Sequence, residues 1–225
     1  MKNSTRQTLL GLAAAGLCAA VALGALIRIT ENFENIQPHE DPQRGWTFNA
    51  GDEGIAVRNG NHYLRASTDT WGVTLSAKTN GSNRLVGNRD YRAEGVAGFE
   101  LTTAGTADFN TVRDMTISLV NDNGTPGDWS DDYGFYHVTG QMMNFNGLPR
   151  TYRYPVPSQH SGSTPDGWVA WALGPNSPTE FTWDQVIADV DQLNFHYFHP
   201  EFFYIFQFHH LGVDNIRVVV NTDWR

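Results

Sequence analysis

Residues 112–121 read VRDMTISLVN, and in this stretch the apolar side chains of Met115, Ile117 and Leu119 alternate with polar ones. A repeat of two residues is typical of a β-strand with one buried face. Asn123-Gly124 follows shortly afterwards, and this dipeptide favours a tight turn. The segment therefore predicts a β-strand followed by a turn.

The same combination recurs along most of the chain. Further Asn-Gly dipeptides stand at residues 59–60, 80–81 and 146–147, between other alternating runs. We expect strands near residues 30–36, 45–50, 54–58, 62–67, 71–77, 95–104, 112–121, 133–139, 150–154, 167–173, 192–198, 202–209 and 213–220. Many short strands at regular spacing predict an all-β protein, an antiparallel β-sandwich of the jelly-roll type.

One short helix is expected, from Thr182 to Val190, with Thr182 as its N-cap. The residues that would share its apolar face are Trp183, Val186, Ile187 and Val190. No internal repeat or proline-rich linker divides the chain after the first 28 residues, so we expect a single domain over residues 29–225.

The first 28 residues differ in composition from the rest. Lys2 and Arg6 precede an uncharged apolar run from Leu9 to Ile27. Small residues suitable for cleavage occur at Ala20-Val21-Ala22 and at Ala22-Leu23-Gly24, which indicates a secretory signal peptide. The alternative is an uncleaved N-terminal membrane anchor, an apolar leader helix, because a spanning helix needs about 20 apolar residues. Either interpretation places the domain outside the cytoplasm, secreted or in the cell envelope.

Composition excludes several classes of function. With 15 basic and 24 acidic residues the net charge is −9, so the protein would repel phosphate backbones and nucleic acid is a poor partner. Cys18 is the only cysteine and lies within the apolar run, which leaves the domain without a disulfide, a thiolate zinc site or a cysteine nucleophile. No nucleophile elbow, zinc-protease motif or phosphate-binding glycine loop is found, so we expect no enzymatic activity.

The segment Asn121–Asp132 is the most distinctive candidate for a ligand-binding loop. Asp128, Asp131 and Asp132 would offer polar contacts, and Trp129 at the loop tip would stack on the apolar face of a sugar. The same residue types are also what an ordinary solvated turn requires. The complete set of expected ligand-binding residues is Asp128, Trp129, Asp131, Asp132, Tyr133 and Trp71.

Two carboxylates at opposite ends of the domain form a candidate calcium site. The terminal strands of a jelly roll can lie side by side, which would bring Glu34 next to Asp214. A paired carboxylate needs a cation or a shared proton, and calcium prefers oxygen ligands. The histidines are weaker candidates, because His196 and His199 are three residues apart and would point to opposite faces of a strand.

Three short motifs resemble a frame found in extracellular jelly-roll modules of the laminin-B and carbohydrate-binding kind. They are Glu31-Asn32-Phe33-Glu34, Gly45-Trp46-Thr47 and Gly212-Val213-Asp214-Asn215-Ile216. Between them, residues 121–132 and 183–195 are similar to segments of bacterial exported proteins. The resemblance implies a structural calcium ion that ties the terminal strands together, and by analogy it implies binding to a sugar or a surface component.

These observations together predict an exported, non-catalytic binding module for a glycan or another cell-surface component, with structural calcium as its cofactor. A structural or adhesive envelope protein without a small ligand is the alternative, and a polysaccharide-degrading enzyme is a third. Membrane contact is expected only through an uncleaved N-terminal segment.

Overall fold

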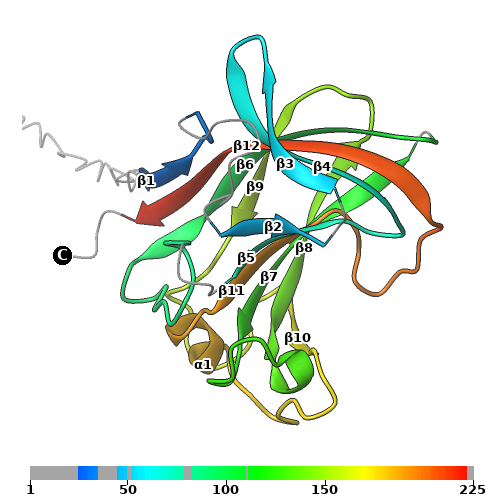
Figure 1. Cartoon of the computed structure of the whole chain (residues 1–225). Helices are drawn as coiled ribbons and strands as arrows, with labels where there is room; N and C mark the ends of the chain where they lie inside the picture. The colour runs from blue at the N-terminus through cyan, green and yellow to red at the C-terminus, as the bar shows by residue number, and fades with distance from the viewer. Residues whose placement is uncertain (1–24, 35–44, 50–51, 79–82, 110, 222–225) are drawn as a thin grey trace, which may run out of the picture.

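The computed structural model describes residues 25–34, 45–49, 52–78, 83–109 and 111–221. Its strands form two antiparallel sheets that pack face to face (Figure 1). Within the described residues no helix is both long enough and apolar enough to cross a membrane. The expected leader lies almost entirely outside these residues.

The first sheet, sheet A, contains six strands. Its order is β3 (Asp52–Arg58), β4 (Asn61–Thr70), β12 (Gln207–Asn221), β6 (Val96–Ala107) and β9 (Arg150–Pro155), and β1 (Ala25–Glu31) pairs with the far part of β12. Sheet B also has six strands. Its order is β10 (Trp168–Ala172), β8 (Tyr133–Asn144), β7 (Val112–Asn121), β11 (Gln192–His196), β5 (Thr74–Lys78) and β2 (Trp46–Phe48).

The chain alternates between the two sheets, for example from β4 to β5 to β6 to β7, as in a jelly roll. The core consists of the inward-facing side chains of both sheets. Met115, Ile117 and Leu119 of β7 are completely buried there. Thr116 and Ser118 on the opposite face are completely buried as well, so β7 is covered on both faces and not on one as expected. Full burial of each such side chain contributes about 1.5–3 kcal/mol. The expected antiparallel β-sandwich is therefore confirmed.

The expected short helix is present as α1 (Trp183–Ala188). Thr182 is its N-cap, and the Thr182 side chain and the Gln185 side chain complete a reciprocal capping box. Trp183, Val186 and Ile187 are buried, and the Trp183 ring packs edge-on against the Phe135 ring at 5.5 Å. The prediction is confirmed because the cap and the apolar face are both local sequence signals.

Several expected strand bounds differ from the structure, and two of the differences lie near the ends of the domain. The strand expected at residues 202–209 starts only at Gln207 and continues without interruption to Asn221 as β12, while residues 202–206 form a loop. Here apolar residues follow one another without alternating, so no single face could bury them. At the other end of the domain, β1 begins at Ala25, so the end of the apolar run pairs with β12.

Candidate functional site

The expected ligand-binding loop is held in place by its own hydrogen bonds. Asp128 caps the short 3₁₀ helix η1 (Trp129–Asp131) by accepting from the Ser130 backbone N–H at 3.0 Å. Asp131 accepts from Thr125 at 2.7 Å and from Asn123 at 3.1 Å, and the first of these bonds is the main reason that the pKa of Asp131 lies below its usual value. The Trp129 side chain is exposed. The loop therefore uses most of its polar groups internally, as a turn does.

The last residue of that loop, Asp132, and the first residue of β8, Tyr133, are buried. Asp132 is 3% exposed and accepts a hydrogen bond from Gln192 at 2.9 Å. Tyr133 is 8% exposed, and its ring packs against the Phe181 ring at 4.9 Å. Burial removes both side chains from the surface that a ligand would touch, so neither has the role expected from the sequence.

Trp71 does not lie beside Trp129. Its ring packs against those of Phe198 and Phe203, at 4.8 and 6.1 Å. Phe198 accepts a hydrogen bond from Thr116, in the middle of β7, whereas the Trp129 loop follows the last residue of β7, Asn121. The two tryptophans are therefore beside different parts of β7 and do not form one site.

Glu34 lies near enough to Asp214 for the two charges to interact. Burial raises the pKa of the Asp214 carboxyl, the bonds from Asn61 and Asn215 oppose this rise, and the Glu34 carboxylate adds to it. The Asp214 oxygens already accept from Asn61 at 3.2 Å and from the Asn215 side chain at 2.8 Å. In the described part of the chain, no three His, Cys, Asp or Glu side chains gather as they would around a metal. Two carboxylates are few for calcium, which takes about 6–8 oxygen ligands.

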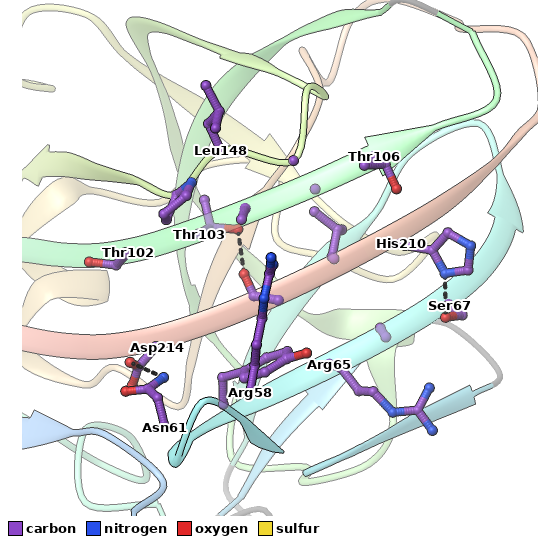
Figure 2. A pocket seen from close by; sticks show the side chains of 18 of the residues that line it. Arg58, Asn61, Arg65, Ser67, Thr102, Thr103, Thr106, Leu148, His210 and Asp214 are labelled. Carbon is purple, nitrogen blue, oxygen red and sulfur yellow. Dashed lines mark hydrogen bonds between the residues drawn. The ribbon is translucent and has the colours of Figure 1, made fainter. Parts of the chain in front are cut away.

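A groove of about 740 Å³ lies on the outer face of sheet A (Figure 2). Its floor is formed by β4, β12 and β6, which are neighbours in the sheet. The β3–β4 hairpin contributes Arg58, and the loop between β8 and β9 contributes Leu148. Of the residues expected to bind a ligand or a metal, only Asp214 lines this groove.

Small residues form the centre of the groove floor, so little side chain rises above the backbone of the sheet there. Ala104 of β6 pairs with Gly212 of β12, and neither carries a side chain larger than a methyl group. A methyl group at Gly212 would lie 3.0 Å from the ring of Tyr63, so this ring lies directly against the backbone of β12. Tyr63 also lines the groove, so the groove contains an aromatic ring, a group that can stack on a flat apolar surface.

Polar side chains lie at both ends of the groove floor. His210, Gly212 and Asp214 alternate with buried residues on β12 and so point to the same outer face. Figure 2 shows the hydrogen-bonded pair Asn61–Asp214 at one end and Ser67–His210 at the other, the latter with a distance of 2.8 Å. At the strand rise of about 3.3 Å per residue, His210 and Asp214 are about 13 Å apart along β12.

Both donors and acceptors of hydrogen bonds are available in the groove. Arg58 only donates, the Asp214 carboxylate only accepts, and the hydroxyls of Thr102 and Thr106 do both. Arg65 forms an exposed ion pair with Asp52 at 3.3 Å. The lining therefore combines one ring with mixed polar groups of both charges, which suits a neutral ligand that carries many hydroxyls.

The sequence analysis missed this groove, although part of its signal was visible. In residues 63–67 the sequence YLRAS alternates, with Leu64 and Ala66 buried, so Tyr63, Arg65 and Ser67 face outward together. An aromatic ring on the polar face of a strand is a usable signal. Its partners on β6 and β12 are distant in the sequence, and only the strand pairing brings them alongside.

No protein-family model matches the chain, and no curated protein matches it. Among solved structures it is similar to a family 11 carbohydrate-binding module from Clostridium thermocellum in complex with a β-1,3-1,4-mixed-linked tetrasaccharide, at 14% identity and a TM-score of 0.46, over 89% of this chain and 98% of that one. It is similar to TmCBM27, a carbohydrate-binding module studied for mannan recognition, at 12% identity and a TM-score of 0.42, over 88% of this chain and 99% of that one. It is also similar to an exo-β-agarase, at 14% identity and a TM-score of 0.44, over 88% of this chain and 25% of that one.

These structures include carbohydrate-binding modules, the kind of domain that the sequence motifs resemble. At such identities and scores the likeness carries no argument about ligand or activity. The evidence for a functional site is therefore the groove on sheet A itself, with its aromatic ring, its small-residue floor and its hydrogen-bonding ends.

Proposed function

We propose that the protein is an exported, non-catalytic β-sandwich module that binds a glycan chain in the groove on the outer face of sheet A. The observation that carries the proposal is the position of the Tyr63 ring beside the Gly212 backbone, between two polar ends of an open groove. A sugar ring has an apolar C–H face and a rim of hydroxyls. Tyr63 would stack on the first, and Asn61, Asp214 and His210 would bond to the second.

The charges in the groove favour binding over hydrolysis. Among its described lining residues Asp214 is the one carboxylate, whereas a glycosidase uses two, about 5–10 Å apart across the cleft. Asp214 is also engaged by Asn61 and Asn215. A glycan or glycan-bearing cell-surface component is thus the proposed partner, and no cofactor is needed for contact with it.

Export is supported by the cleavage signals that precede β1. The cleavage signal Ala22-Leu23-Gly24 ends one residue before Ala25, the first residue of β1. Cleavage after Gly24 would therefore leave β1 whole and able to pair with β12. We expect N-terminal sequencing of protein recovered outside the cell to begin at Ala25, or at Leu23 if the earlier signal is used. Recovery of a chain that begins at Met1 would favour the uncleaved anchor instead.

The test of glycan binding is a panel of soluble polysaccharides and oligosaccharides, measured by calorimetry with calcium present. We expect saturable binding to one class of glycan. Replacing Tyr63 by Ala should then weaken the affinity by about tenfold or more, which corresponds to about 1.4 kcal/mol. Tyr63→Phe keeps the ring and should retain most of the affinity.

Trp129→Ala is the matched control, because Trp129 is an exposed aromatic residue that lies outside the groove. We expect it to bind as the wild type does. Loss of binding in Trp129→Ala with retention in Tyr63→Ala would move the site to the loop expected from the sequence. If a cooperatively folded sample binds no glycan of the panel, the result would instead favour a structural or adhesive envelope protein.

A further inference from the structure

The loop between β11 and β12 displays an unusual concentration of exposed apolar side chains. Within five residues, Phe202 is 57% exposed, Phe203 80%, Ile205 66% and Phe206 60%. In Figure 1 this segment is the orange loop that projects from the sandwich just before β12. Soluble proteins rarely expose such a cluster without a function for it, because contact of apolar groups with water is unfavourable.

Contacts of Tyr204 and Glu201 with the domain hold the loop in place and leave these four apolar side chains pointing outward. Tyr204, in the middle of the loop, points back toward the domain. Its hydroxyl bonds to Asp114 at 3.4 Å, and the Arg113 guanidinium lies 4.2 Å from the centre of its ring. The Glu201 carboxylate accepts a hydrogen bond from Tyr136 at 2.7 Å. The one charged residue of the segment 199–208 is therefore held by the domain, which leaves an apolar tip.

The shape of the cluster is unsuited to a flat surface. The rings of Phe203 and Phe206 are inclined by 61° to each other. Phe202 packs against the His199 ring instead of lying in line with them. Stacking on the face of a crystalline polysaccharide requires rings in one plane, whereas a fluid apolar phase accepts side chains in any orientation.

The exposed area is also small for a protein partner. With about 200 Å² for each large side chain, the exposed fractions of these four residues amount to roughly 500 Å². A stable protein–protein interface buries about 800 Å² on each partner. A second copy of the chain would therefore need further contacts beyond this cluster, and the cluster is enough by itself only for a partner into which its side chains can be immersed.

We propose that the Phe202–Phe206 loop inserts into the hydrocarbon region of a lipid bilayer. The segment carries no Lys or Arg and the chain has a net charge of −9, so insertion relies on apolar contact and needs no anionic lipid. Residues 207–221 of β12 separate the loop from the strand end at which Ala25 pairs with Asn221, about 45 Å at the usual rise per residue. The loop would thus engage a membrane at the end of β12 that lies away from β1.

The experiment uses the full chain with Cys18→Ser, which removes the only cysteine. An environment-sensitive NBD fluorophore is attached at Phe203→Cys, and in the control protein at Leu148→Cys, which is 68% exposed on the groove of sheet A. Both sites are largely exposed and apolar, although Phe203 also packs against Trp71, so the melting temperature of each labelled protein is measured to show that it is folded. On adding phosphatidylcholine vesicles we expect the emission to rise several-fold at position 203 and to stay constant at position 148.

The other outcomes each contradict the proposal. An equal rise at both positions would show adsorption through another part of the chain, such as its first 24 residues, and no rise at position 203 would show that the loop stays in water. A rise on microcrystalline cellulose but not on vesicles would assign the loop to a polysaccharide surface. A lipid-free dimer that Phe203→Ser dissociates in sedimentation would assign it to a second copy. Glycan binding in the groove is measured separately and does not depend on these results.

Discussion

Replacing His196 by Gln is expected to change how the stability of the protein depends on pH. His196 lies on β11, on the outer face of sheet B, and is nevertheless 4% exposed. Its Nδ1 lies 2.8 Å from the Thr74 hydroxyl and its Nε2 lies 2.9 Å from the Ser118 hydroxyl. The side chains of Trp171 and Phe198 pack edge-on against the ring. The imidazole is therefore bonded at both nitrogens and separated from water.

Burial lowers the pKa of His196 from 6.5 to about 3. As the pH falls below 6.5, the unfolded chain takes up a proton at this residue and the folded protein does not. The stabilising contribution is thus complete above pH 6.5 and is lost as the pH falls toward the folded pKa. At about 1.4 kcal/mol per pH unit, the loss amounts to about 3 kcal/mol between pH 6.5 and pH 4.5.

The assay is urea unfolding followed by tryptophan fluorescence at several values from pH 7.5 to pH 4.5. Glutamine keeps a donor and an acceptor but does not titrate, so His196→Gln should lose about 3 kcal/mol less free energy of unfolding over this range than the wild type. His210→Gln is the matched control, an exposed histidine that also bonds to a serine, Ser67. The free energy of unfolding of His210→Gln should depend on pH as that of the wild type does. Parallel curves for the wild type and His196→Gln would refute the reasoning.

Two further changes test the packing and the calcium hypothesis. Gly134→Ala should destabilise the protein by about 3 kcal/mol in urea unfolding, because its methyl group would clash with the carbonyl oxygen of Leu119 on the paired strand. Gly54→Ala, which meets nothing within 4 Å, should be nearly neutral. If Glu34 and Asp214 share calcium, a chelator should lower the melting temperature of the wild type and leave that of Glu34→Gln unchanged. A wild-type melt that the chelator leaves unaltered would contradict the calcium site.

The strands and the helix were predictable wherever their signal is local. Alternation at Met115, Ile117 and Leu119 predicts a strand, and the structure contains it with all three buried. The burial of Thr116 and Ser118 on the opposite face was not predictable, because it depends on contacts with Phe198 and His196. The capping box at Thr182 likewise predicts where α1 begins. Prediction failed at residues 202–206, where consecutive apolar residues have high strand propensity but the structure leaves most of them in solvent. Propensity indicates what a segment prefers, while burial depends on what packs against it.

The candidate site was harder to predict because composition does not distinguish a solvated turn from a binding loop. Asp131 and Trp129 lie in one short segment with the residue types of a carbohydrate site, yet the Asp131 carboxylate is occupied by Thr125 and Asn123. Asp132 is buried against Gln192, a residue of another strand. No pattern within the loop itself could have revealed that contact.

The sequence by itself determined the class of fold, because alternation, turn dipeptides and helix caps act between residues that are close in the chain. Only the tertiary structure decided where the groove lies. Asn61 and Asp214, which meet at one of its ends, are 153 residues apart, and they meet because β4 pairs with β12 in one particular register. A shift of one residue would turn Tyr63 into the core and remove the ring from the surface. That register depends on the packing of both sheets and is not encoded in any single segment.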